Sequence, residues 1–108
     1  MINLFKWQTG RQGTGYRKLL LASNCKTWDV YLLDYPQNTY ITPHVDCVSD
    51  GKHYRLNIVL FGSGKFNGET LFSLGNRIHF FRPDIMEHSV DNIKTRRMVL
   101  SIGFVKHD

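Results

Sequence analysis

The sequence predicts an all-β domain of the sandwich or jelly-roll class. Three observations lead to this prediction: about eight short strand-like runs, spacings of roughly 8 to 14 residues between them, and turn signals in most of the gaps. The chain has 108 residues, which is enough for one domain and too few for two. Hydrophobic residues make up 42% and charged residues 21%, so the composition is not that of a disordered chain.

The strands can be placed in chain order. Residues 16–22 form a short apolar run that could be helix or strand by pattern alone. Trp28–Tyr35 is rich in aromatic and β-branched residues and ends before a proline, so it is a predicted strand. Strands are also expected at 40–46 and 54–61, with a turn through the three glycines Gly62, Gly64 and Gly68 after the second. The last four expected strands are 69–74, 77–82, 86–90 and 96–106.

The excess positive charge lies in the first quarter of the chain. The net charge is +5, and five basic residues precede the first acidic one, Asp29: Lys6, Arg11, Arg17, Lys18 and Lys26. We therefore divide the single domain, 1–108, into a basic N-terminal arm with the first strand, 1–26, and a catalytic core, 27–108. The arm could bind nucleic acid or an acidic peptide, close over a site as a lid, or be a solvated terminus.

Membrane insertion and secretion are not expected. The longest uncharged apolar runs, such as 19–22 and 58–61, are far shorter than the roughly 20 residues that span a bilayer, and the N-terminus lacks the apolar core of a signal peptide. The two cysteines, Cys25 and Cys47, form no C-x-x-C pair, so neither a disulfide framework nor a four-ligand zinc site is predicted. A reducing cytoplasm is the expected compartment.

One predicted strand carries half of a metal site. His44 and Asp46 are two residues apart, so an extended backbone places both side chains on one face. Such a pair arises often by chance and, taken alone, could be a surface pair on a strand. His88, 42 residues after Asp46, could supply a third ligand. Two histidines and one carboxylate are the facial triad of non-haem Fe(II) oxygenases.

The last predicted strand carries an arginine suited to carboxylate binding. Arg97 shares a face with the small residues Ser101 and Gly103, and a guanidinium can hold a carboxylate through two hydrogen bonds. Arg96 is the alternative, because a shift of one residue in the strand exchanges the two faces.

An ordered set of motifs resembles the 2-oxoglutarate- and Fe(II)-dependent oxygenases, most of all the prolyl-hydroxylase-like and small bacterial or phage-type members. The resemblance covers nearly the whole chain after about residue 28 and implies a double-stranded β-helix, a variant of the jelly roll. The motifs are Tyr35-Pro36, His44-x-Asp46, Asn67-Gly68-Glu69-Thr70-Leu71, Phe81-Arg82-Pro83-Asp84, His88 and Arg97.

The resemblance also implies roles for single residues. The iron ligands would be His44, Asp46 and His88. Arg97 would pair with the distal carboxylate of 2-oxoglutarate, and Tyr35 would donate a hydrogen bond to this cosubstrate. Many relatives place a second carboxylate anchor on the strand that corresponds to 54–61, where this sequence ends in Leu60-Phe61, so Asn57 is a weak substitute for that anchor.

The implied reaction consumes O2 and 2-oxoglutarate, releases succinate and CO2, and hydroxylates or oxidatively demethylates a substrate that the sequence does not identify. Two alternatives keep the fold. The first is a non-catalytic module that binds a metal or 2-oxoglutarate, and the second is a zinc site in which water is the nucleophile.

The outer face of the last strand leads to an expectation about partners. Met98, Leu100, Ile102 and Phe104 alternate with the residues around Arg97, and they are large and apolar. Such a face needs a cover, which could be the N-terminal segment or a second copy of the chain in a homodimer.

Overall fold

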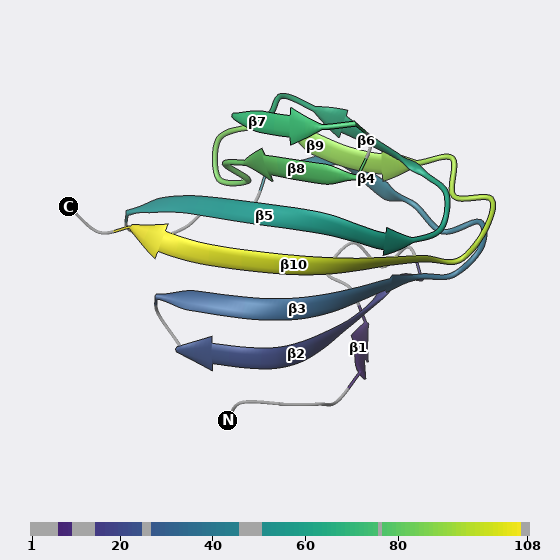
Figure 1. Cartoon of the computed structure of the whole chain (residues 1–108), viewed down its shortest axis with the longest axis horizontal. Helices are drawn as coiled ribbons and strands as arrows, with labels where there is room; N and C mark the ends of the chain where they lie inside the picture. The colour runs from purple at the N-terminus through teal and green to yellow at the C-terminus, as the bar shows by residue number, and fades with distance from the viewer. Residues whose placement is uncertain (1–6, 10–14, 25–26, 46–50, 76, 107–108) are drawn as a thin grey trace.

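The protein is an all-β domain of two antiparallel sheets (Figure 1). The computed structural model describes residues 7–9, 15–24, 27–45, 51–75 and 77–106, and these contain ten strands and no helix. Within these ranges no helix has the length and apolarity needed to cross a membrane.

The larger sheet has seven strands and the smaller one three. The order in the larger sheet is β1-β2-β3-β10-β5-β8-β7, with the bounds β1 Trp7–Thr9, β2 Arg17–Asn24, β3 Trp28–Tyr35, β10 Arg97–Lys106, β5 Lys52–Phe61, β8 Ile78–Phe81 and β7 Phe72–Leu74. The order in the smaller sheet is β4-β9-β6, with the bounds β4 Ile41–His44, β9 His88–Asp91 and β6 Lys65–Gly68. The chain therefore moves from one sheet to the other after β3, β4, β5, β6, β8 and β9, as in a jelly roll.

The core lies where the two sheets face each other. Tyr35, Phe81 and Val99 of the larger sheet pack in one buried cluster with Phe66 and Val90 of the smaller sheet. Alternation along β10 decides which side chains enter this space, because every second residue from Arg97 to Gly103 is buried. Strand β10 thus presents the face that the sequence predicts, with Arg97, Ser101 and Gly103 turned inward.

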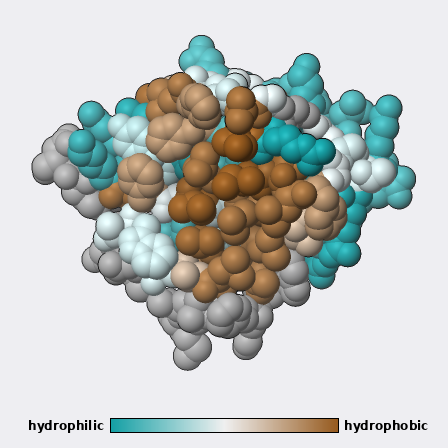
Figure 2. Space-filling view, in the orientation of Figure 1, coloured by the Kyte–Doolittle hydropathy of each residue, from teal (hydrophilic) through white to brown (hydrophobic). Residues whose placement is uncertain are grey.

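The opposite face of the larger sheet is apolar. Met98, Leu100 and Ile102 alternate with the buried residues of β10, and they remain partly exposed. Figure 2 shows a continuous apolar area over the middle of the face in view, where β3, β10 and β5 lie in Figure 1. Tyr54 stacks on Phe104, with ring centroids 5.2 Å apart, and so joins β5 to β10.

The predicted strands agree with the structure except at two places. Trp28–Tyr35 has its predicted bounds, and the run at 16–22 is a strand, β2, shifted slightly toward its C-terminal end. The expected turn through Gly62, Gly64 and Gly68 is wrong for its second half, because residues 65–68 form β6 against β9. The described ranges therefore contain ten strands where about eight were predicted for the chain, since β1 was also not predicted. Residues 1–6, 10–14 and 25–26 of the expected basic arm lie outside the described residues.

Candidate metal centre and cavity

Two of the three expected metal ligands face each other across the smaller sheet. His44 of β4 and His88 of β9 are direct cross-strand partners. Their ring centroids are 4.3 Å apart, and the ring planes are inclined at 52°. His88 is buried and packs against Phe81, with ring centroids 5.0 Å apart, whereas His44 is partly exposed. Residues that are 44 positions apart in the sequence therefore meet at one place.

A backbone carbonyl orients each imidazole. His44 Nδ1 lies 2.6 Å from the carbonyl oxygen of Thr42, and His88 Nδ1 lies 3.0 Å from that of Met86. A carbonyl oxygen can only accept, so Nδ1–H is the donor in both hydrogen bonds. Metal-binding histidines commonly have this arrangement, in which the second ring nitrogen donates to a carbonyl and fixes the ring.

The third expected ligand, Asp46, lies outside the described residues. The described part of the chain contains no cluster of three or more histidine, cysteine, aspartate or glutamate side chains that could hold a metal ion. The sequence predicts that the third ligand is Asp46, which follows the end of β4 by two residues.

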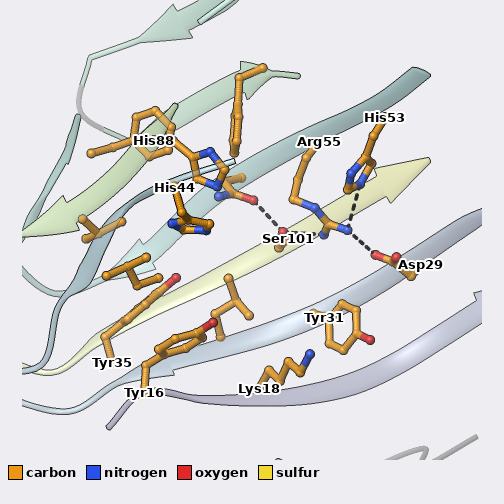
Figure 3. Close-up of a pocket in the computed structure, with 16 residues that line it drawn as sticks. Tyr16, Lys18, Asp29, Tyr31, Tyr35, His44, His53, Arg55, His88 and Ser101 are labelled. Carbon is orange, nitrogen blue, oxygen red and sulfur yellow. Dashed lines mark hydrogen bonds and ion pairs between the residues drawn. The ribbon is translucent and has the colours of Figure 1, made fainter. Parts of the chain in front are cut away.

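The two histidines lie in the wall of a cavity between the sheets (Figure 3). Its volume is about 240 Å³, which is near the lower end of the range for small-molecule sites. One group of lining residues is apolar: Leu33, Ile41, Phe66, Phe81 and Val90. A second group is polar and lies mostly on the larger sheet: Lys18, Asp29, His53, Arg55, Asn57 and Ser101. The cavity therefore suits a small molecule with an apolar body and a charged end.

Tyr35 lines the cavity, as the sequence interpretation requires, and it is almost completely buried at 2% exposure. Its ring stacks on Tyr16 with centroids 5.4 Å apart. Burial raises the pKa of the Tyr35 phenol, and Tyr16 raises it further. The hydroxyl group is therefore protonated at neutral pH and can donate a hydrogen bond.

Arg97 is buried at 3% exposure, but it is not among the residues that line the cavity. It is the cross-strand partner of Tyr35, and its guanidinium lies close to Gly64 and Ile93. Within the described residues its Nε has no hydrogen-bond partner. Burial lowers the pKa of this guanidinium, because desolvation disfavours its charge. Arg97 is thus a buried cation whose Nε lacks the hydrogen bond expected for a buried polar atom.

Arg96, the alternative to Arg97, has a different environment. Its side chain is 55% exposed and forms two hydrogen bonds with Asp34, from Nε at 2.7 Å and from Nη2 at 3.0 Å. Arg96 is therefore a structural ion-pair partner, and the register of β10 directs Arg97 inward.

Asn57, the expected secondary anchor, belongs to a hydrogen-bonded chain in the cavity. Ser101 Oγ donates to Asn57 Oδ1 at 2.6 Å and accepts from Arg55 Nη1 at 2.7 Å. Arg55 Nη2 also binds Asp29 Oδ1 at 2.8 Å. Asn57 Oδ1 is thus already occupied by a protein donor.

The sequence leaves Arg55 open between a structural ion-pair partner and a site residue, and in the structure Arg55 lines the cavity, as does His53. The signal for Arg55 was its place two residues before Asn57, because alternate residues of a strand share a face. His79 is 5% exposed and stacks on Phe66 with ring centroids 4.5 Å apart.

The sequence matches no protein-family model and no curated protein. Solved structures match the fold. KdgF from a Halomonas species superposes with a TM-score of 0.68 at 13% identity, covering 95% of this chain and 88% of that one. A Pseudomonas putida prolyl-4-hydroxylase gives 0.69 at 11% identity, covering 95% and 79%. The Schizosaccharomyces pombe Cnp3 cupin domain gives 0.70 at 10% identity, covering 94% and 69%.

These similarities define the class of the fold. The chain has a cupin-type double-stranded β-helix, which is the fold that the motifs predicted. At 10 to 13% identity they carry no information on activity, so the function must be argued from the side chains.

Proposed function

We propose that this protein is a 2-oxoglutarate- and Fe(II)-dependent dioxygenase that hydroxylates or oxidatively demethylates a small substrate. The observation that carries the proposal is the facing pair of His44 and His88 in the cavity wall, with each Nδ1 bound to a backbone carbonyl. Histidines whose Nδ1 is bound in this way bind a metal through Nε2. Asp46, by its spacing from His44, would complete a set of two histidines and one carboxylate.

The donor set fits Fe(II). Imidazole and carboxylate ligands suit divalent iron, and three protein ligands leave coordination positions for a cosubstrate and O2. When bound, the iron would supply the activation of O2 that couples decarboxylation of 2-oxoglutarate to oxidation of the substrate. In the balanced reaction one oxygen atom enters succinate and the other enters the hydroxylated product, while CO2 leaves. The chain's own residues hold the metal, bind the organic acids and exclude water.

The environment of Arg97 fits a cosubstrate with two carboxylates. A buried guanidinium without a described counter-ion gains most from an anion, because a bidentate pair would satisfy its donors. Tyr35 lines the cavity beside it and carries a hydroxyl donor. We therefore assign Arg97 and Tyr35 to the distal carboxylate of 2-oxoglutarate. The second candidate, a non-catalytic binding module, shares this assignment and differs only in turnover.

The test is formation of succinate from 2-oxoglutarate under air with Fe(II) and ascorbate. We expect slow formation of succinate even without substrate, and a decrease of at least about 100-fold in His44→Ala and His88→Ala, because each loses a ligand. Lys94→Ala, at an exposed position that does not line the cavity, is the control and should keep the activity. Binding of Co(II), followed by its absorption, separates the two candidates, since a non-catalytic module binds the metal without forming succinate.

Succinate formation that is equal in the wild type and in both histidine variants would contradict the proposal. Retained metal binding in the double variant His44→Ala/His88→Ala would contradict the assignment of the ligands.

A further inference from the structure

The larger sheet contains a second cationic group that the metal and the cosubstrate do not use. Arg55 lies on the inner face of β5 and lines the same cavity as His44 and His88. Its side chain is 15% exposed, so the guanidinium is largely shielded from water but still accessible from the cavity. Figure 3 shows it on the opposite side of the cavity from Tyr35 and Tyr16.

The protein holds this guanidinium in a fixed position. Nη1 donates to Ser101 Oγ at 2.7 Å and Nη2 to Asp29 Oδ1 at 2.8 Å. The group lies directly against the backbone of Gly103, where an added Cβ would come within 2.5 Å of the Arg55 Cζ. Asp29, Gly103 and Arg55 are neighbours in one row across β3, β10 and β5. Three strands therefore fix the arginine before any ligand binds.

The charges beside Arg55 favour an anion. Asp29 neutralises one cation, but Lys18 also lines this part of the cavity, with its Nζ 5.2 Å from the centre of the Tyr31 ring. Lys18 thus adds a second cationic group to the wall of the cavity. Asp29 is 31% exposed, so its side chain can adjust when an anion binds to the guanidinium.

The rest of the cavity determines the size and character of the ligand. Leu33, Ile41 and Val90 give it an apolar wall, and Phe66 and Phe81 add two aromatic rings. A volume of about 240 Å³ excludes a nucleic-acid strand or a folded peptide from the interior.

We propose that Arg55, held by Asp29, Ser101 and Gly103, is the recognition site for the carboxylate of a small substrate with an apolar body. The inference rests on the proposed function in one respect, namely that the ligand is called the substrate. Binding of the carboxylate to Arg55 itself needs no metal. The proposal also distinguishes two anion-binding sites: Arg97 binds the cosubstrate and Arg55 binds the substrate.

The experiment uses 3-phenylpropionate as the probe and calorimetry on the metal-free protein as the measurement. We expect the wild type to bind this acid at least tenfold more tightly than the neutral 3-phenylpropionamide, because only the acid can pair with a guanidinium. Arg55→Gln should weaken binding of the acid at least tenfold. Arg82→Gln is the matched control, because Arg82 is also paired with an aspartate at 2.6 Å and 18% exposed but does not line the cavity.

A second variant should change the affinity for the acid in the opposite direction from Arg55→Gln. Asp29→Asn removes the competing carboxylate while the arginine keeps its charge, so binding of the acid should become stronger. A purely structural role of the Arg55–Asp29 pair predicts weaker binding in both variants. Asp29→Asn also keeps the inference testable if Arg55→Gln does not fold.

Three results would overturn the inference: no binding of the acid to the wild type, equal binding of the acid and the amide, or unchanged binding in Arg55→Gln. Loss of 2-oxoglutarate binding in Arg55→Gln, with binding kept in Arg97→Met, would overturn it as well, because Arg55 would then be the cosubstrate anchor. Binding of Co(II) should be unaffected in Arg55→Gln, so failure of this inference is distinguishable from failure of the metal site.

Discussion

At the scale of single residues, the buried carboxylate of Asp34 shows how the protein compensates a buried negative charge next to the site. Asp34 is fully buried on β3 and accepts from Arg17 Nη2 at 2.6 Å and from Arg96 Nε at 2.7 Å. Burial alone would raise the pKa of this carboxyl, but the hydrogen bonds and charges of the two arginines lower it overall. Asp34 therefore joins β2 and the start of β10 through one ionised group.

Replacing Asp34 by Asn should lower the free energy of unfolding by about 1–3 kcal/mol near neutral pH, because the two arginines lose the shared negative charge and one of its two acceptor oxygens, while both remain partly solvated. The folded-state pKa lies below the unfolded value, so this stabilisation is complete above the unfolded pKa and is lost as the pH falls through the folded pKa. Urea unfolding should therefore show a difference between variant and wild type that is constant from about pH 7 to pH 5 and shrinks below about pH 4. Glu69→Gln, at an exposed position, is the control, and a difference that grows on acidification would contradict the assignment.

At the scale of strands, the contact between β6 and β9 positions one of the two histidines. Gly68 is the direct partner of His88 and has a φ of 137°, which only glycine adopts readily. A Cβ at this position would lie 2.5 Å from the carbonyl oxygen of Glu87 and 3.1 Å from the Cα of His88. The backbone of β9 can therefore lie where it does because residue 68 has no side chain.

Gly68→Ala should push β9 away, lower stability by about 1–3 kcal/mol and weaken Co(II) binding about 10- to 100-fold through displacement of His88. Gly75→Ala is a suitable control, because Gly75 also has a positive φ, 58°, but no atom lies within 4 Å of its added Cβ. Urea unfolding and metal titration measure the two effects. Equal metal affinity in both variants would show that the approach of β6 does not position the histidine.

Strands β10 and β6 show what can and cannot be predicted from the sequence. The alternation of β10 predicts its inward face, because this face depends only on local backbone geometry. The ligand pair inferred from the spacing of His44 and Asp46 stays a prediction, because Asp46 lies outside the described residues. Strand β6 escapes prediction because its glycines signal a turn, while its pairing with β9 is a long-range contact. The partners of Arg55 could not be predicted for the same reason, since Asp29 and Ser101 lie 26 and 46 residues away.

At the scale of the whole molecule, the two faces of the larger sheet have opposite characters. The inner face carries Arg55, Ser101 and Arg97, and the outer face carries the apolar side chains of β10 (Figure 2). A polar interior costs stability unless its groups are paired, so its presence favours a binding function. The homodimer expected from the apolar outer face stays a prediction, which sedimentation at high protein concentration checks.

The polar interior leads to a prediction for the stability of the ligand-free protein. Replacing Arg97 by Met removes a buried cation that lacks a partner on its Nε and keeps a similar volume, so the free energy of unfolding should rise by about 1–3 kcal/mol. Arg55→Met is the matched comparison and should destabilise, because it breaks pairs with Asp29 and Ser101.

Binding of 2-oxoglutarate and a metal should favour the two variants in the opposite order from their stability without ligand. Adding 2-oxoglutarate with Mn(II) should raise the melting temperature of the wild type and of Arg55→Met, because a ligand that binds the native state stabilises it by about 2.7 kcal/mol at a hundred times its Kd. Arg97→Met should show little further rise, since the cation that would hold the distal carboxylate is gone. Thermal unfolding with and without the ligands measures both effects in one set of curves. Destabilisation in Arg97→Met, or an equal response to 2-oxoglutarate in both variants, would mean that Arg97 supports the fold rather than the cosubstrate.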